Sequence, residues 1–461
     1  MVIILYIDEK MKKIEKMREI LASISEGVSV HELKKKFGDL LKSVKPWEIP
    51  IIEQELIRSG ISVDEIARLC DLHVELFREF VSNKLNVDSY PDGHPLRVLV
   101  EENDSILKDV ELLGLYLSGF LNAKTENDRK KYFEAMKKLV LELMDIKKHF
   151  VKEQMLLFPY LERLGITAVP TVLWMKQDEV YFTLREVKRL IDDYSEDKLE
   201  KLKIIINDFI RVASDMVFRE NNIFYPTMAV ILSDAEWYAV KIQEEKIGYY
   251  KVEPKKYKPS VEPVFPYKFR VDDPEIINRL PNEVRALIEH TGMDIDTYEV
   301  VREDDIKLDY GYLNAEEIDA IFKALPVEIT FVGADGRTRY FSNREEMVFV
   351  RTPSIIGRKV EFCHPPRSIE LVKNMVKSFL NGRRDPYVFW AKSRNKTILV
   401  QYIPVIRDKE LIGIMEVAMD VTKIKDVIES GRIPYFKSMS LSRLREIVSK
   451  NLSEMKAVRV K

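Results

Sequence analysis

The sequence predicts a mainly α-helical protein of several domains, one of which is a small α+β domain with a five-stranded antiparallel sheet. Between residues 94 and 231, apolar residues recur at helical spacing in four long segments joined by short turns, which is typical of a four-helix bundle. After Pro326 the apolar period changes from that of a helix to that of a strand. With 461 residues, the chain is expected to form roughly two to four domains.

The composition argues against several classes of partner. Lys and Arg (74) nearly balance Asp and Glu (76), so no overall basic field favours nucleic acid. The apolar run Met1–Ile7 is too short to span a bilayer, and no other run approaches that length. Two cysteines in a chain of this length indicate a reducing compartment rather than a disulfide framework. We therefore expect a soluble, cytoplasmic protein without a nucleic-acid or membrane partner.

Residues 1–85 are predicted to be helical, because their apolar spacing contains no strand pattern. Ser62 is placed as the N-cap of a helix over 63–83. Cys70 and His73 lie one turn apart in that helix, but a metal site there would need two more ligands from elsewhere. A buried cysteine beside a hydrogen-bonded histidine is the commoner arrangement, so the sequence leaves the role of this pair open.

Four long helices follow. Pro95 stands at an early helical position, where its missing N–H costs nothing. Gly165 and Pro170 are expected to end the second helix, and Ser233 to begin a further short one. The four predicted helices span about 94–121, 126–164, 171–193 and 197–231.

The second helix carries His149 and Glu153, which are four residues apart and therefore lie on one face of a helix. Inward-facing His and Glu residues on facing helices build metal sites inside helical bundles. The fourth helix repeats the pattern at Glu220, which like Glu153 is followed six residues later by a proline. Met216 stands where the repeat would place a second histidine.

The composition changes again after residue 248. Six prolines between 254 and 281 predict a semi-rigid, extended linker that can lie along a neighbouring domain. We assign residues 249–312 to this linker and expect one short helix in it, over 281–291.

The next segment alternates like a β-sheet. Asp335-Gly336 between two apolar runs, 327–332 and 337–341, is a strong signal for a hairpin. A helical middle reaches about residue 380, and strands are then expected over 387–392, 397–406 and 411–421. Terminal helices are expected over 424–430 and 440–456.

The bundle resembles the hemerythrin-like, HHE-type cation-binding family. The similarity lies in His94-Pro95, Glu101-Glu102-Asn103 and the segments 149–162, 173–179 and 218–226. The resemblance implies iron, mononuclear or dinuclear, or another divalent metal as cofactor. The surviving ligands that it implies are His94, His149, Glu153 and Glu220, whereas Gln177 and Met216 occupy positions at which the family has histidine.

This ligand set leaves two alternatives open. Glu153 and Glu220 could bridge two irons, with one histidine for each, and Asp178 or Glu102 could substitute for a missing ligand. Without metal, two carboxylates in an apolar bundle are costly. They would then need a shared proton or salt bridges, for which Lys148, Lys152 and Arg219 are the nearest cations in sequence.

Residues 313–424 resemble a PAS domain, as judged from 325–332, Ile356-Gly357, Cys363 to Pro366, Phe389-Trp390 and 420–422. Cys363 is the candidate for redox sensing and His364 for binding haem, although His-Pro-Pro is also a sequence that stops one helix and starts the next. Phe331, Trp390 and Tyr402 are candidates to line a pocket for a small ligand, and aromatic residues on strands are also common as core. Residues 1–85 resemble a domain of unknown function that accompanies both others. The predicted division is 1–85, 90–248 (bundle), 249–312 (linker), 313–424 (PAS) and 425–461 (C-terminal helices).

The architecture predicts an intracellular sensor or regulatory protein rather than an enzyme. Because no effector pattern is found, output would pass to a signalling partner protein, and the resemblance implies a homodimer through the PAS domain. The alternative is a diiron protein that handles oxygen, peroxide or nitric oxide, or donates iron for cluster repair. The third hypothesis is a metal-free interaction scaffold.

Overall fold

A computed structural model divides the chain into two compact units, residues 1–300 and 301–461. It describes residues 15–16, 19–20, 23, 28, 30–43, 45–63, 65–67, 85–270, 273–278, 280, 285, 295–343, 347–393 and 395–430. Outside these residues lie Met1–Ile7, Cys70 and His73, almost all of the helix predicted at 281–291, and the helix predicted over 440–456. No helix among the described residues is long and apolar enough to cross a membrane.

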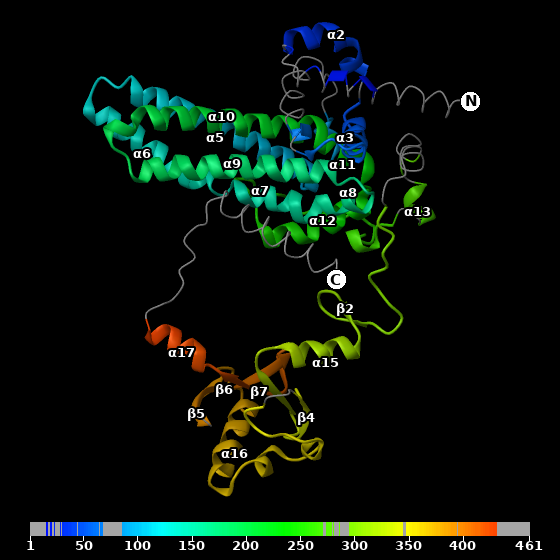
Figure 1. The fold of residues 1–461 in the computed structure, drawn as a ribbon, viewed down its shortest axis with the longest axis vertical. Coiled ribbons are helices and arrows are strands. Elements are labelled where there is room, and N and C mark those ends of the chain that lie inside the picture. The colour runs from blue at the N-terminus through cyan, green and yellow to red at the C-terminus, as the bar shows by residue number, and fades with distance from the viewer. Residues whose placement is uncertain are drawn as a thin grey trace, which may run out of the picture. The chain divides into compact units, whose positions relative to one another are not determined.

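The first unit contains the four-helix bundle. Its long helices run side by side in Figure 1, and they bury the apolar stripes that the spacing predicted, such as Leu96, Leu99 and Ile106 on the first. The packing of these stripes against one another, rather than helix propensity, stabilises helices of this length. The long helices are α5 (Pro95–Leu121), α6 (Glu126–Leu143), α9 (Ala168–Asp192) and α10 (Leu199–Arg219).

The prediction of one continuous second helix was wrong in detail. The segment consists of α6, α7 (Ile146–Lys152), a π-helical turn η2 (Glu153–Leu157) and α8 (Phe158–Arg163). The fourth helix is interrupted in the same way, by the π-helical turn η4 (Glu220–Phe224) before α11 (Tyr225–Ile231). Each π turn precedes a proline, Pro159 or Pro226, in the first turn of the next helix. A proline inside a regular α-helix loses one backbone hydrogen bond and its ring crowds the carbonyl four residues back, so the wider turn relieves that conflict.

Shorter elements flank the bundle. The helix predicted at Ser233 is α12 (Asp234–Ile247), which begins with a reciprocal cap between Ser233 and Glu236. At the other flank, Gln54 on α3 accepts hydrogen bonds from the backbone N–H groups of Thr167 and Ala168 at the start of α9, at 2.9 and 2.8 Å. The remaining elements here are α2 (Val30–Ser43), α3 (Glu48–Arg58), η1 (Val87–Ser89) and η3 (Glu196–Lys198).

The proline-rich segment lies along the bundle. Tyr250 and Phe269 are fully buried. The Tyr160 hydroxyl donates to the carbonyl of Val264 at 2.7 Å, and Arg163 Nε donates to the carbonyl of Phe269 at 3.3 Å. The described part of this segment contains η5 (Pro266–Lys268) and α13 (Pro274–Ile277).

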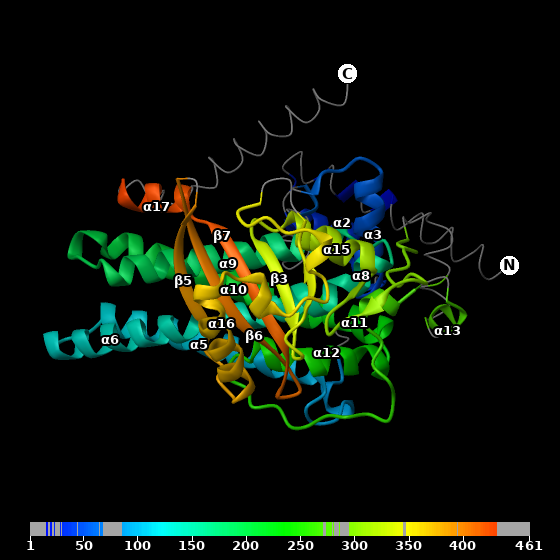
Figure 2. The same ribbon diagram turned by 90° about the horizontal axis from the view of Figure 1, so that it is seen from below.

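The second unit contains the predicted sheet, and the five strands are confirmed. Their order is β4-β3-β7-β6-β5, with every neighbouring pair antiparallel (Figure 2). The strands are β3 (Glu328–Gly333), β4 (Thr338–Phe341), β5 (Tyr387–Ser393), β6 (Lys396–Arg407) and β7 (Glu410–Asp420). The other elements are β1 (Ile306–Lys307), β2 (Tyr312–Leu313), α15 (Ala315–Ala324), η6 (Pro353–Ile355), η7 (Val360–Cys363), α16 (Pro366–Leu380) and α17 (Thr422–Glu429).

Two segments cover one face of this sheet. Met375 and Phe379 of α16 pack against Ile414 on β7. Val348 and Phe349 pack against a second cluster, which contains Ile398, Val400 and Ala418. The core of the second unit is therefore closed by a helix at one end and by an extended segment at the other.

Gly413 on β7 allows the sheet to pack closely. A Cβ at this position would lie 2.4 Å from the carbonyl oxygen of Val332 and 2.5 Å from the ring of Phe331. We expect Gly413→Ala to destabilise the second unit by about 1–3 kcal/mol, the usual cost of overpacking. Thermal unfolding followed by circular dichroism measures the change, with the exposed Glu410→Ala on the same strand as control. Equal unfolding midpoints for the two variants would contradict the expectation.

Candidate metal centre

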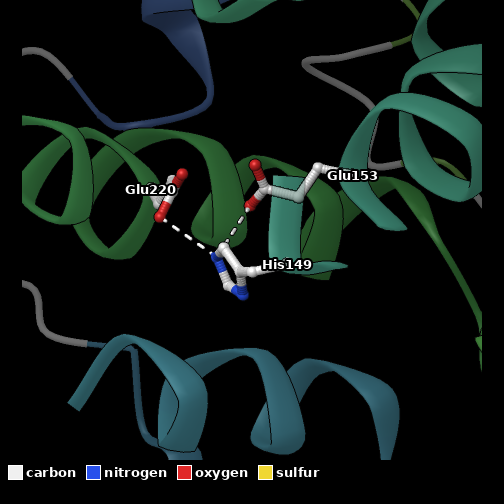
Figure 3. A group of neighbouring side chains, drawn as sticks. All are labelled: His149, Glu153 and Glu220. Atoms are coloured by element: carbon white, nitrogen blue, oxygen red, sulfur yellow. Dashed lines mark hydrogen bonds and ion pairs between the residues drawn. The ribbon is translucent and has the colours of Figure 1, made fainter. Parts of the chain in front are cut away.

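Three buried side chains meet inside the bundle. His149 on α7, Glu153 at the start of η2 and Glu220 at the start of η4 each offer one ligand atom, and these atoms lie within 4.8 Å of one another. All three residues have no exposed surface. Figure 3 shows the two carboxylates pointing toward the imidazole, Glu153 from the same helical segment and Glu220 from another. The structure thus brings together three of the four predicted ligands.

The π turns contribute to this arrangement. Each begins at one of the two glutamates, six residues before a proline. Turns of this kind occur often at functional sites. The repeated spacing places Glu153 and Glu220 at the same point of two neighbouring helical segments.

The imidazole of His149 has polar partners on both nitrogens. Nδ1 lies 2.7 Å from Glu102 Oε2. Nε2 lies 3.3 Å from Glu220 Oε2, 3.1 Å from the Tyr225 hydroxyl and 3.8 Å from Glu153 Oε1. A carboxylate on Nδ1 fixes the ring and its tautomer, which leaves Nε2 directed at the other two glutamates.

Glu102 on α5 is fully buried and has three hydrogen-bond partners. Besides His149, it accepts from Lys152 Nζ at 2.5 Å and from the backbone N–H of Tyr250 at 2.7 Å. Burial alone would raise the pKa of this carboxyl, but hydrogen bonds and charge interactions with His149 and Lys152 lower it below its usual range. Glu102 is therefore ionised and is engaged by groups other than a metal.

The other two glutamates are less well satisfied. Gln177 Nε2 donates to Glu153 Oε2 at 2.5 Å, and Gln154 Nε2 donates to Gln177 Oε1 at 2.7 Å. Among the described residues, Glu153 Oε1 and Glu220 Oε1 are buried without a hydrogen-bond partner. A buried oxygen without a partner costs free energy unless a proton or a cation neutralises it.

Without an ion, protons on the side chains neutralise the negative charge of the buried carboxylates. Burial and the nearby Glu220 raise the pKa of Glu153 well above its usual range. Burial lowers the pKa of His149, but Glu220 and Glu102 outweigh burial and raise it to about 10. The site therefore holds positive charge as protons on its own side chains.

The donor set fits one divalent cation. One imidazole nitrogen and two carboxylate oxygens are ligands that iron, manganese and zinc accept. When ionised, Glu102, Glu153 and Glu220 carry three negative charges. Lys152 supplies one positive charge, and a single dication would supply the remaining two, with His149 neutral. A second dication would leave an excess of positive charge in a buried site.

The other predicted metal positions lie outside this group of three. Gln177 is a hydrogen-bond donor to Glu153, as above, and Met216 is buried on α10. His94 is the N-cap of α5, where its Nδ1 accepts from the N–H of Leu96 at 3.2 Å. Its ring packs against three aromatic rings, those of Tyr90, Trp237 and Tyr257, with centroids 4.7 to 5.2 Å away. Of the cations considered as partners for the glutamates, Lys152 pairs with Glu102 and Lys148 pairs with Asp145.

The candidate residues of the PAS domain do not form one site. Cys363 is exposed, and His364 Nδ1 lies 2.8 Å from the carbonyl of Val360. Tyr402 faces the core with Phe389, whereas the strand alternation puts Trp390 on the opposite face, with 69% of its surface exposed. Thr330 and Tyr402 both pair with Glu416, so these two residues lie on the same face. Phe331 follows Thr330 in the strand and therefore lies on the opposite face, with Trp390.

Sequence reasoning considered Glu102 only as a substitute metal ligand and assigned no role to Tyr225 or Tyr250. Glu102 follows Leu99 and precedes Ile106 on the apolar stripe of α5, and a glutamate in such a stripe is a signal that could have identified it. Tyr225 immediately precedes Pro226, as Phe158 precedes Pro159, so its place near Glu220 follows from the repeated spacing. Tyr250 is far away in sequence and gave no comparable signal.

Comparison with protein families gives three matches. Residues 17–83 match a family of unknown function (DUF438), residues 94–228 match the hemerythrin HHE cation binding domain, and residues 318–422 match a PAS domain. These matches confirm the architecture that the resemblance implied. The combination of the last two domains suggests a sensor or regulatory role, and the hemerythrin HHE family is one of cation-binding domains.

Solved structures give similarities over parts of the chain. A C-terminal domain from Streptococcus mutans is 35% identical, over 28% of this chain and 99% of that chain, with a TM-score of 0.26. The PAS domain from Bordetella pertussis BvgS is 17% identical, over 25% of this chain and 96% of that chain, with a TM-score of 0.20. A comparison with curated proteins gives no match.

The environment of His94 predicts a pH dependence of stability. Burial, and then the charge of Lys241, lower the pKa of His94 to about 4. The unfolded chain takes up a proton below its ordinary pKa of about 6.5, whereas the folded chain stays neutral down to about 4. Folding stability should therefore fall as the pH falls through this window, by on the order of 3 kcal/mol in total.

Denaturant unfolding between pH 7 and pH 4 measures this loss. His94→Ser keeps a side-chain oxygen for the cap but does not titrate, so its stability should depend less on pH in this window. The same pH slope in both proteins would contradict the assignment.

Proposed function

We propose that the protein is a cytoplasmic sensor whose helical bundle binds one divalent cation through His149, Glu153 and Glu220, and whose output passes to a partner protein. The observation that carries the metal site is the pair of fully buried glutamate oxygens, Glu153 Oε1 and Glu220 Oε1, which have no hydrogen-bond partner among the described residues. They lie within reach of an imidazole nitrogen whose other nitrogen is already held by a carboxylate.

Iron is the ion we propose first, and manganese and zinc suit the same ligands. A cation held by three protein ligands keeps a position open for a small molecule and acts there as a Lewis acid or a redox centre. The chain's own residues would prepare that position. Glu102 holds the His149 ring, and Gln177 holds one oxygen of Glu153. The Tyr225 hydroxyl lies 3.1 Å from Nε2.

A diiron centre is less well supported. Carboxylate-bridged pairs of metal ions need further ligands for each ion beyond the bridges. Here Lys152 and Tyr250 occupy one oxygen of Glu102, and His149 occupies the other. Gln177 and Met216 replace imidazoles with a weak oxygen ligand and a soft sulfur ligand. These substitutions favour sensing at a single ion over the chemistry of a metal pair.

The PAS domain is proposed as a second input, for a small ligand or a redox signal, and as the contact of a homodimer. On edge strand β5, Val388 and Trp390 point to the same face and are 49% and 69% exposed. An exposed edge with apolar side chains is a template for association with a second copy.

Metal content tests the proposal directly. We expect about one iron, manganese or zinc ion per chain in protein purified without an affinity tag, by elemental analysis. Glu153→Gln and Glu220→Gln each remove a charged ligand with little change of volume and should abolish binding. Glu101→Gln is the matched control and should keep the ion, because Glu101 is next to Glu102 in sequence but is only half-buried and pairs with Arg97.

The other outcomes favour the alternatives. About two ions per chain, lost in the same variants, would mean that a diiron site forms after all. No ion in the wild-type protein would leave the bundle as a metal-free scaffold.

Dimer formation is tested separately. Trp390→Glu should convert a dimer to a monomer in sedimentation velocity, because it places a charge in the apolar contact. Ile406→Glu, a similarly sized change at a residue of β6 that is 40% exposed, serves as control. A monomeric wild-type protein would contradict the homodimer.

A further inference from the structure

The chain makes a sharp turn where it leaves α12 and enters the proline-rich segment. Gly248 and Lys251 both have positive φ, 89° and 52°. Between them Tyr250 is fully buried, and its hydroxyl donates to Asp109 on α5 at 2.5 Å. Lys251 Nζ pairs with the same Asp109 at 2.8 Å and with Glu142 on α6 at 2.6 Å. Residues 248–251 are thus attached to two helices of the bundle.

The same four residues also reach the candidate metal centre. The backbone N–H of Tyr250 donates to Glu102 Oε1 at 2.7 Å. The other oxygen of this carboxylate, Oε2, lies 2.7 Å from His149 Nδ1. A single buried carboxylate therefore joins a proposed metal ligand to the first residues of the segment that leads to the second unit.

We propose that residues 248–251 form a latch, which Glu102 holds more tightly when a metal ion fixes His149. This inference rests on the proposed metal site and deepens it. It names the segment whose attachment to the bundle would change when the ion binds. Glu102 acts as a positioning residue that does not itself bind the ion.

The physical basis is that one buried carboxylate, that of Glu102, binds both His149 and the backbone N–H of Tyr250. Glu153 and Glu220 approach the same imidazole from two helical segments, and one oxygen of each has no hydrogen-bond partner among the described residues. An ion bound to all three side chains would restrict them together. Glu102 has no exposed surface, and both of its oxygens already have partners. A restricted His149 therefore also restricts the acceptor of the Tyr250 N–H. Binding at two coupled sites is reciprocal, so opening the latch must weaken the ion's binding by the same factor.

The chain that follows the latch makes further contacts with the bundle near the proposed ligands. After residue 251 the chain continues along α8, where Tyr160 and Arg163 bind the carbonyls of Val264 and Phe269. Arg163 also pairs with Asp296 at 2.6 Å and binds the carbonyl of Tyr298 at 3.0 Å. The α8 helix directly follows the π turn that begins at Glu153. The segment is therefore attached to the bundle at two places. One is linked to His149 through Glu102, and the other is on α8, which follows the π turn of Glu153.

Hydrogen exchange of the full chain tests the proposal, with Mn²⁺ as the probe and elemental analysis of the same samples. We expect the Tyr250 amide to exchange on the order of ten-fold more slowly when Mn²⁺ is bound, a coupling of ordinary size for linked sites. Glu220→Gln, which removes a ligand but leaves the latch residues in place, should show no such slowing.

Two latch variants and one control test the reciprocal effect. Tyr250→Phe removes the hydroxyl bound to Asp109, and Lys251→Ala removes the ion pairs with Asp109 and Glu142. Both should speed exchange at the Tyr250 amide and weaken Mn²⁺ binding by a similar factor. Lys255→Ala removes a comparable lysine of the same segment, one that pairs with Asp92 outside the latch, and should change neither quantity.

The outcomes separate the latch from the metal site. If Mn²⁺ binds but exchange at Tyr250 is unchanged, or if the latch variants behave like Lys255→Ala, the latch is wrong and the metal site stands. If no Mn²⁺ binds to the wild-type protein, the metal site is wrong and the latch falls with it.

Discussion

The hydrogen bond between the carboxylate of Glu102 and Nδ1 of His149 is the contact on which the rest of the site depends. Two charged or polar groups inside an apolar bundle are tolerated only when their partners are complete. Lys152 and the Tyr250 N–H complete the set for Glu102. Hydrogen bonds and charge interactions with His149 and Lys152 outweigh burial and lower the pKa of this carboxyl below its usual range. The ionised carboxylate in turn fixes the imidazole, so Nε2 is presented to the two glutamates that lack full hydrogen bonding.

Two segments of the bundle with the same spacing supply this site, residues 149–159 and 216–226, and we call them its two arms. The arms are similar but not equivalent. Each arm has a glutamate at the first residue of a π turn and a proline six residues later. One arm adds His149 four residues before its glutamate, and the other has Met216 there. The geometry of the two arms repeats, but only one of them has an imidazole. A symmetric pair of ions would therefore lack a histidine for its second ion. The asymmetry of the ligand set, together with the ammonium of Lys152, is what favours one ion.

The sequence predicts much of this fold because its periodic patterns are long and undisturbed. The change from helical to strand period after Pro326, the Asp335-Gly336 turn and the three later apolar runs locate all five strands along the chain. The His149–Glu153 spacing identifies two of the three residues of the ligand group, because residues four apart lie on one face of a helical segment.

The parts that sequence reasoning missed are those set by tertiary contacts. Glu102 and Tyr250 are 148 residues apart, and no local pattern reports that they share a hydrogen bond. His94 was carried into the ligand set by resemblance, whereas its backbone position as a helix cap directs Nδ1 to its own helix. Trp390 and Phe331 share aromatic character with Tyr402, but the strand register decides which face each side chain occupies.

The proline-rich segment shows how composition and contacts answer different questions. Prolines predict that such a chain is extended, and an extended chain leaves its N–H and C=O groups without partners of their own. The bundle provides those partners through Glu102, Tyr160 and Arg163. A segment that the sequence presents as a linker is therefore bound to the first unit for much of its described length.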